Sequence, residues 1–231
     1  MHRIGKYGAE DSMSGLISDN YRILLVMSRF GIGLGVGNKG IGEVCRDNGV
    51  DTTTFLAVVN MVLDEDGVSP ARPEDISLGA LLSYLHNSHD YFLEFRLPAI
   101  RSKLAEVVGT GNDLDRAIVA YFDEYVAEVD RHMKHEEDVV FPYVRALLAG
   151  QAPAGYTIGE FSRHHDQVEA RLTEFKNIII KYYPAASTNE INGVLFDIFN
   201  CENDLASHNM IEDRLFVPAI EMLETANTAK R

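Results

Sequence analysis

The sequence predicts an all-α protein, in which an up-down-up-down four-helix bundle follows a small helical N-terminal domain. Two observations predict this fold. No segment of the 231 residues alternates apolar and polar side chains as a half-buried strand does. Beyond residue 75, apolar residues recur at helical spacing over four long stretches that short connections separate. Long helices joined by short connections pack as antiparallel neighbours, which is the arrangement of a bundle.

The N-terminal part reads as short helices. Residues 1–13 are expected to form a mobile tail, and short helices follow within residues 14–63. About 50 residues bury little core by themselves, so this part should lean on the rest of the protein. The polar stretch 64–75, DEDGVSPARPED, contains two prolines and a glycine and is the predicted linker. The predicted domains are residues 1–66 and residues 74–228.

The four bundle helices follow this linker. Each break between them holds glycine or proline beside a residue that often begins a helix, such as Asp113, Thr157 or Thr188. The helices are predicted near residues 77–104, 113–149, 157–183 and 188–225.

The composition excludes several classes of partner. The net charge is −14, from 35 acidic and 21 basic residues. A field of that sign repels phosphate backbones and anionic lipid heads, which argues against nucleic-acid and membrane partners. No apolar run approaches the ~20 residues of a membrane span, and the first residues lack the apolar core of a signal peptide. Two cysteines, Cys45 and Cys201, cannot form a disulfide framework, so we expect a reducing cytoplasm.

The bundle region contains an internal repeat. In both copies a histidine is followed by glutamate four residues on and by proline six residues after that. The members of the first copy are His132, Glu136 and Pro142, and those of the second are His208, Glu212 and Pro218. Two further histidines, His86 and His165, are separated by a slightly longer interval, and each lies one helix upstream of a copy. The bundle is thus predicted to consist of two related helical hairpins.

Helix geometry turns this spacing into a site. Residues four apart lie about 40° apart on one helix face, so each copy sets an imidazole beside a carboxylate. The four histidines share their faces with apolar residues and should point inward. An ordinary core histidine with hydrogen-bond partners would explain one of them. Four histidines and two glutamates, buried unpaired, would cost several kcal/mol each, whereas metal coordination offsets that cost.

The number of ligands favours two metal ions that share bridging carboxylates. Four imidazoles and two carboxylates exceed the needs of one structural zinc, and mixed nitrogen and oxygen ligation favours iron or manganese. Glu136 and Glu212 would be the bridges. His86 and His132 would serve one ion, and His165 and His208 the other, although the opposite pairing is open.

Three other side chains adjoin this predicted site. Glu128 precedes His132 by four residues, and Asp204 precedes His208 by four. A carboxylate one turn back could accept the second ring N–H of a ligand histidine, could line a route for departing metal, or could simply be a solvated charge. His89, one turn from His86, could be an additional ligand or a proton donor.

These motifs resemble the haemerythrin-like cation-binding proteins, and more specifically the di-iron family called repair of iron centres. HMKHEEDVVFP and HNMIEDRLFVP match its His-x3-Glu-x5-Pro pattern, while HNSH (86–89) and HHD (164–166) match its first and third histidine motifs. His165 is preferred to His164 because it directly precedes Asp166. The iron ligands that the resemblance implies are His86, His132, Glu136, His165, His208 and Glu212.

The resemblance also implies a function. It implies two non-haem iron ions with an oxo or hydroxo bridge, in a cytoplasmic protein of nitrosative and oxidative stress defence. Such a protein repairs iron–sulfur clusters by donating iron, so iron–sulfur proteins would be its recipients. Nitric oxide reductase activity, with nitric oxide or dioxygen as the small ligand, and a homodimer are open. The alternative is a dioxygen carrier or a gas or redox sensor, which would need a fifth histidine such as His89 or His135.

One departure from the family concerns the N-terminal helices. They resemble the short helical domain that precedes the bundle in this family, whose members often carry a Cys-Cys pair between the first helices. This chain has GIGLGVGN at residues 31–38 instead. The resemblance therefore does not extend to thiol chemistry linked to that pair, and the role of this domain stays open.

Overall fold

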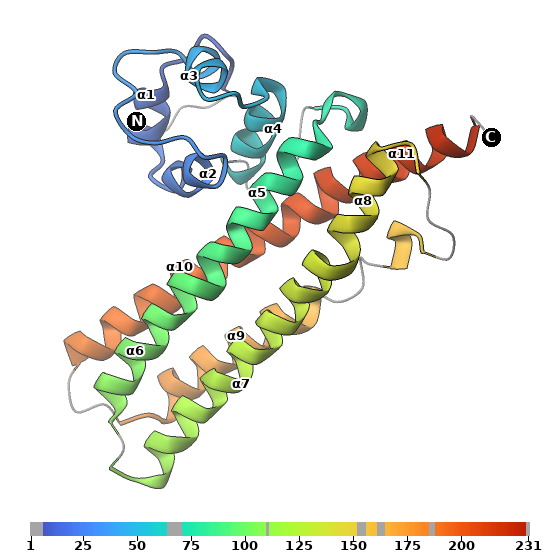
Figure 1. Ribbon diagram of the computed structural model, residues 1–231. Helices are drawn as coiled ribbons and strands as arrows, with labels where there is room; N and C mark the ends of the chain where they lie inside the picture. The colour runs from blue at the N-terminus through green and yellow to red at the C-terminus, as the bar shows by residue number, and fades with distance from the viewer. Residues whose placement is uncertain are drawn as a thin grey trace. The chain divides into compact units, whose positions relative to one another are not determined.

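The computed structural model describes residues 7–63, 71–109, 111–151, 156–160, 165–184 and 188–229 (Figure 1). Most of these residues are helical, and they contain no β-strand, only an isolated bridge between Ser12 and Gly40. The all-α class is therefore confirmed.

Four short helices form the N-terminal part. They are α1 (Met13–Asp19), α2 (Ile23–Arg29), α3 (Ile41–Asp47) and α4 (Thr52–Leu63). Side chains cap two of them: the Gly15 N–H donates to Ser12 Oγ at 3.2 Å, and the Thr54 N–H donates to Asp51 Oδ1 at 2.8 Å. The predicted linker lies outside the described residues over 64–70, and Pro73–Asp75 form a 3₁₀ turn.

The predicted mobile tail is wrong for its described residues. Tyr7 is buried, and its backbone N–H donates to Asn60 Oδ1 at 2.7 Å. The Asn60 amide donates back to the Tyr7 carbonyl at 3.0 Å, and the Tyr7 hydroxyl donates to Asp19 at 2.6 Å. Because the buried Asn60 needs these partners, the chain is held from Tyr7 onward. Residues 1–6 lie outside the described residues.

The long helices begin and end close to the predicted positions, and a wider π turn interrupts three of them. The first consists of α5 (Leu78–Asp90), the π turn η2 (Tyr91–Arg96) and α6 (Leu97–Val108). The second consists of α7 (Asp113–His135), the π turn η3 (Glu136–Val140) and α8 (Phe141–Leu148). The third, α9 (His165–Tyr182), follows a 3₁₀ turn at Ile158–Glu160, and the fourth consists of α10 (Thr188–Ile211), the π turn η5 (Glu212–Phe216) and α11 (Val217–Ala229).

Each π turn is followed by a proline. Across the three turns, backbone N–H groups donate to carbonyls five residues earlier, at Phe92, Glu136 and Glu212. The second residue of the α-helix that follows is in each case a proline, namely Pro98, Pro142 and Pro218. A proline lacks the N–H of the regular ladder, and its ring clashes with the carbonyl four residues back. The wider turn accommodates the proline and lets the helix continue.

The contacts divide the chain into two compact units. The first unit comprises Met1–Ser88, Tyr143–Gly159 and Met210–Arg231, and the second comprises His89–Pro142 and Glu160–Asn209. Three of the four boundaries fall within the continuous long helices, and the fourth falls in the 3₁₀ turn Ile158–Glu160. The sequence-based domains, residues 1–66 and 74–228, stay a prediction.

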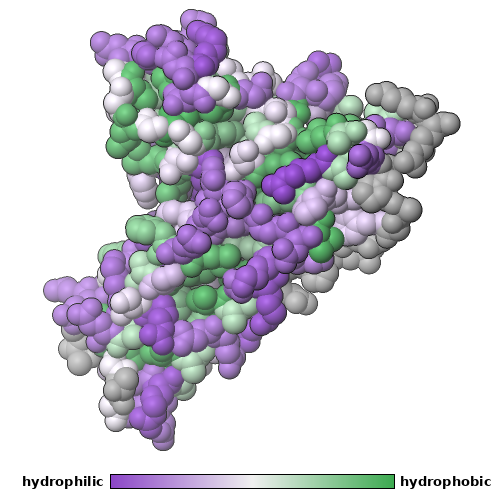
Figure 2. All heavy atoms as spheres, in the orientation of Figure 1, coloured by the Kyte–Doolittle hydropathy of each residue, from purple (hydrophilic) through white to green (hydrophobic). Residues whose placement is uncertain are grey.

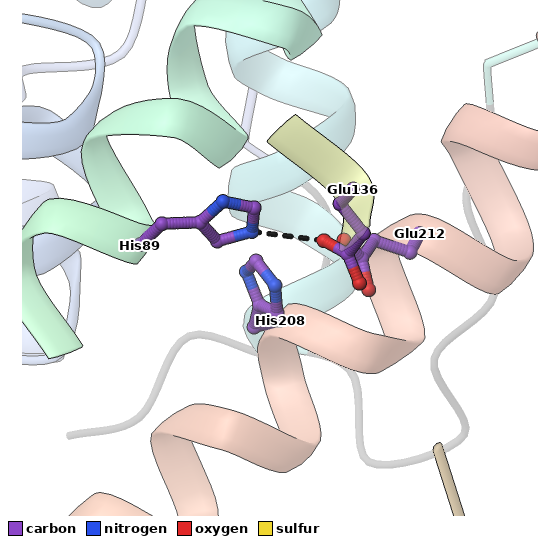
Figure 3. Close-up of side chains that lie close together, drawn as sticks. All are labelled: His89, Glu136, His208 and Glu212. Atoms are coloured by element: carbon purple, nitrogen blue, oxygen red, sulfur yellow. Dashed lines mark ion pairs between the residues drawn. The ribbon is translucent and has the colours of Figure 1, made fainter. Parts of the chain in front are cut away.

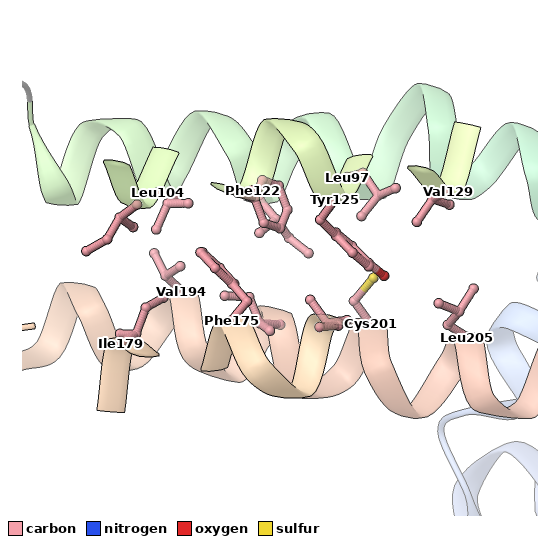
Figure 4. Close-up of a cluster of buried hydrophobic side chains, with 14 of the residues drawn as sticks. Leu97, Leu104, Phe122, Tyr125, Val129, Phe175, Ile179, Val194, Cys201 and Leu205 are labelled. Carbon is pink, nitrogen blue, oxygen red and sulfur yellow. The ribbon is translucent and has the colours of Figure 1, made fainter. Parts of the chain in front are cut away.

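In the second unit, four helical segments surround one core. Helix α6 packs against α7, and α7 against α9. Ion pairs join α9 to α10 through Lys176 and Glu202, and η2 to α10 through Arg96 and Asp197. The side chains between them are apolar, and Phe122, Tyr125 and Cys201 are among those drawn in Figure 4. This is the predicted antiparallel bundle, in which short connections make consecutive helices neighbours.

In the first unit, the N-terminal helices pack on α5. Phe30 lies against Phe55 and Tyr84, with ring centroids 5.4 and 4.9 Å away. The Asn87 amide donates to the carbonyl of Arg29 at 2.7 Å. These contacts to α5 agree with the expectation that the short N-terminal helices pack against other parts of the chain, because they bury little core by themselves.

The surface is mixed. Hydrophilic side chains predominate over much of the face drawn in Figure 2, with hydrophobic ones between them. Phe196 is 67% exposed and Phe95 is 63% exposed. In the described part of the chain, no helix combines the length and the apolar character that crossing a membrane requires.

Candidate metal centre

Four titratable side chains meet in the interior. His89, Glu136, His208 and Glu212 each offer one ligand atom, and these four atoms all lie within 4.8 Å of one another (Figure 3). His89 is 2% exposed, and the other three are completely buried. His89 comes from the end of α5 and Glu136 from the start of η3. Glu212 follows His208 by one turn in the same continuous helix.

The carboxylate of Glu136 lies between two imidazoles. Its Oε2 is 2.9 Å from His89 Nε2, and its Oε1 is 2.9 Å from His132 Nε2. The ring of His208 meets that of His89 at a centroid distance of 5.3 Å and an angle of 65°. Three histidines therefore converge on the region of the two glutamates.

Aromatic rings surround the imidazoles. Phe141 stacks on His89 with a centroid distance of 5.4 Å and an angle of 7°. The rings of Phe92 and His208 are nearly perpendicular, with a centroid distance of 5.8 Å and an angle of 77°. These contacts restrict how the imidazoles can turn and keep water from their faces.

The donor set fits a metal. Two carboxylates that are both buried and within 4.8 Å of each other are disfavoured by burial and by mutual repulsion. A divalent cation offsets both effects, and imidazole nitrogen with carboxylate oxygen suits iron or manganese. The cluster also joins different helices, as the carboxylate-bridged metal sites of helical bundles do.

The π turns coincide with this cluster. Glu136 and Glu212 are each the first residue of a π turn, and His89 lies two residues before Tyr91, the first residue of the remaining π turn. Because a π turn takes one more residue than an α turn, it shifts the helical phase of the residues that follow. Such turns are frequent at functional sites.

The structure brings together most of the ligands predicted from the sequence. Glu136, His208 and Glu212 belong to the cluster, and His132 lies at its edge with 13% of its side chain exposed. His165 is the first residue of α9, but its side chain lies outside the described residues.

The structure brings His89 rather than His86 into the cluster. His86 is exposed, whereas His89 is buried. The reason is helical phase about Leu85, which is fully buried. His89 lies about 40° from Leu85 around the helix and His86 about 100° from it. His89 therefore continues the buried face, and His86 leaves it.

A sequence signal for His89 existed. His89 and His165 are each followed by aspartate, and they are separated by the same interval that relates His132 to His208 and Glu136 to Glu212. The interval from His86 to His165 is longer. The pairing of His86 with His165 therefore departed from the constant spacing of the repeat.

The carboxylates expected beside the ligands have different surroundings. Glu128 forms an ion pair with Arg171 of α9, and Asp204 is half-buried one turn before His208. That either one accepts a hydrogen bond from a ligand histidine stays a prediction. An unexpected carboxylate, Glu137, lies 2.8 Å from His89 Nδ1.

Comparison with known proteins agrees with this geometry. Residues 80–220 match the family model described as Hemerythrin HHE cation binding domain. A protein of Haemophilus influenzae described as a probable iron–sulfur cluster repair protein is 23% identical over 158 residues, which are 68% of this chain and 69% of that protein. No solved structure matched the chain. Because the family match spans more than half of the chain and includes the whole buried cluster, the chain belongs to the haemerythrin HHE cation-binding family.

Proposed function

We propose that this protein holds two non-haem iron ions and uses them in the repair of iron–sulfur clusters. The observation that carries the proposal is the buried cluster of His89, Glu136, His208 and Glu212. The name of the Haemophilus influenzae relative supports the repair role. The recipients would be iron–sulfur proteins damaged under nitrosative or oxidative stress.

The ligand assignment follows the geometry and the internal repeat. Glu136 and Glu212 would bridge the ions, and the terminal ligands would be His89, His132, His165 and His208. His89 takes the place that the sequence-based prediction gave to His86, because His89 is buried within reach of Glu136 and His86 is exposed. Four imidazoles and two shared carboxylates leave each ion few protein ligands, so a small molecule can also bind.

The chain's own residues would hold and shield the iron. Glu136 and Glu212 supply the negative charge that offsets the cations, and Phe141 and Phe92 keep water from the imidazole faces. His132, with 13% of its side chain exposed, is the most exposed of the described ligands. We therefore propose that donated iron leaves on the side of His132. Bound iron would supply the redox chemistry, including any reduction of nitric oxide.

The decisive experiment is metal analysis with Mössbauer spectroscopy on protein purified without air, followed by a repair assay. Wild-type protein should contain two irons and restore activity to a cluster enzyme damaged by nitric oxide. Glu136→Ala should do neither, while the matched surface variant His86→Ala should do both. Iron-loaded wild-type protein that restores no cluster would overturn the repair role.

A second candidate is a dioxygen carrier or gas sensor, which the aromatic surroundings of His89 and His208 favour because they suit a small apolar ligand. A carrier would need a fifth histidine ligand, and His135 is poorly placed to supply it because its side chain is exposed. Stopped-flow spectra of the reduced protein mixed with dioxygen distinguish the two. A stable and reversible adduct would favour the carrier, and rapid irreversible oxidation would favour repair.

A further inference from the structure

The imidazole of His89 lies between two carboxylates from one π turn. Its Nε2 is 2.9 Å from Oε2 of Glu136, inside the cluster. Its Nδ1 is 2.8 Å from Oε1 of Glu137, the next residue of η3. One nitrogen therefore faces the cluster, and the other faces away from it.

The chemistry of imidazole gives the second contact its meaning. A neutral imidazole carries its proton on one nitrogen, and only the other nitrogen can donate a lone pair to a metal. If Nδ1–H donates to Glu137, then Nε2 keeps its lone pair and directs it into the cluster. Carboxylates that hold ligand histidines in this way also raise their basicity.

The surroundings of Glu137 suit this role. Its side chain is 27% exposed, so it remains partly solvated and its charge costs little, whereas the imidazole that it contacts is 3% exposed. Phe141 stacks on one face of the His89 ring, and the edge contact with His208 limits the other movements of the ring. Stacking alone does not fix the ring, because a half-turn about the Cβ–Cγ bond keeps the stacking but exchanges Nδ1 with Cδ2 and Nε2 with Cε1. A carboxylate on one side distinguishes the two orientations.

We propose that Glu137 is the positioning residue for His89: its carboxylate accepts a hydrogen bond from Nδ1–H and so directs Nε2 toward the iron site. The assignment rests on the proposed metal centre. Since Glu136 and Glu137 are adjacent, the same π turn places a bridging carboxylate and the group that orients a neighbouring ligand. Any shift of η3 would disturb both.

The test compares four proteins: wild type, Glu137→Ala, Glu137→Gln and Asp138→Asn. Asp138 is exposed on the same turn, so Asp138→Asn removes the same charge as Glu137→Gln without touching His89. Each protein is loaded with ferrous iron without air. The rate at which a ferrous chelator removes the iron is then measured. The absorption spectrum of the oxidised centre is recorded on a separate sample.

Glu137→Ala should raise the removal rate of one iron by about 10- to 100-fold, if the usual loss of metal affinity on removing such a partner appears in the rate of dissociation. The other iron should leave at the wild-type rate. Glu137→Gln should have a smaller effect because its amide oxygen can still accept a hydrogen bond from Nδ1–H. Asp138→Asn should match wild type.

A second readout reports the tautomer directly. In zinc-loaded, ¹⁵N-labelled wild-type protein, the His89 Nδ1 should carry the proton and Nε2 should show the shift of a metal-bound nitrogen. Glu137→Ala should lose the slowly exchanging Nδ1 proton. A merely structural ion pair would change neither the tautomer nor the release of a single iron.

The outcomes separate this assignment from the proposed function. If Glu137→Ala matches Asp138→Asn in both readouts while wild type holds two irons, the positioning role is wrong and the metal centre stands. If wild type binds neither iron nor zinc, the metal centre is wrong, and the assignment falls with it. Should circular dichroism show that Glu137→Ala is unfolded, Glu137→Leu, which fills similar space and cannot accept the hydrogen bond, replaces it under the same criteria.

Discussion

Helices α7 and α10 each pass through two buried regions that differ in what stabilises them. The inward face of α7 carries Phe122 and Val129 in the apolar core of the second unit, and η3, which continues the helix, begins with Glu136 in the buried His/Glu cluster. Along α10 the same face carries Leu205 and then His208. The helical phase and the burial continue, but the chemistry changes from hydrocarbon to ligand within about two turns. Burial by itself therefore does not say which force holds a segment in place.

The two regions should respond differently to metal. Burying an apolar side chain contributes roughly 1.5–3 kcal/mol whether or not iron is present. Burying a carboxylate is unfavourable unless a cation or hydrogen bonds compensate it. We therefore expect the apolar region to be stable in the metal-free protein and the cluster region to gain its stability from iron.

The largest expected change in stability comes from the apolar region. Phe122 is completely buried, and Phe122→Ala should lower the free energy of unfolding by about 3–5 kcal/mol through lost burial and a residual cavity. The loss should be similar in iron-loaded and metal-free protein, as measured by urea denaturation. A loss that appears only with iron would contradict the separation of the two regions.

The next effect should appear only with iron. Glu212→Ala or His132→Ala should lose metal and with it the stabilisation that bound iron provides, about 3 kcal/mol at a free iron concentration 100-fold above Kd. Thermal unfolding with and without a chelator measures this difference. Metal analysis that finds both irons in either variant would refute its assignment as a ligand.

The two neighbouring histidines of α5 provide a sharper comparison. His89→Ala should weaken binding of at least one iron, because it removes a proposed ligand that lies 2.9 Å from Glu136. His86→Ala should leave the metal content unchanged and the free energy of unfolding within about 0.5 kcal/mol, since its side chain is exposed. Titration of metal-free protein with ferrous iron measures both. If His86→Ala loses iron and His89→Ala keeps it, His86 is the ligand, as the sequence predicted.

The smallest effect on metal is expected at Cys45, in the first unit. Burial raises the pKa of the Cys45 thiol to about 11, so the thiol stays protonated at neutral pH. Alkylation of the folded protein by iodoacetamide should therefore be slow at pH 7, and Cys45→Ala should hold as much iron as wild type. Rapid alkylation, or loss of iron in the variant, would show that the N-terminal helices take part in the chemistry.

Much of the site was predictable because, in a regular helix, the sequence spacing of two residues fixes the angle between their side chains around the helix axis. The four-residue spacing in each copy places His208 beside Glu212 and His132 beside Glu136, and the structure shows both glutamates buried. The apolar pattern likewise predicted the four long helices to within a few residues at most of their ends. Such features depend mainly on interactions within one helix, so a single segment contains the necessary information.

The choice between His86 and His89 was harder because the two lie only about 60° apart around the helix. Both border the apolar face of α5, and the sequence signals that distinguish His89 are the constant interval of the repeat and the aspartate that follows it. The π turns were not predicted either. Proline at positions 98, 142 and 218 removes a regular hydrogen bond, but a kink, a helix end or a π turn each accommodates that loss.

The sequence by itself determined the helical class, the positions of the long helices and the two glutamates at the centre of the site, because periodic patterns and repeated spacings act locally. The tertiary structure decided that His89 is the buried histidine, that Glu137 contacts its second nitrogen, and that Glu128 pairs with Arg171. These choices depend on which side chains of separate helices meet. That meeting is fixed by close packing between helices, which spacing along one helix does not specify.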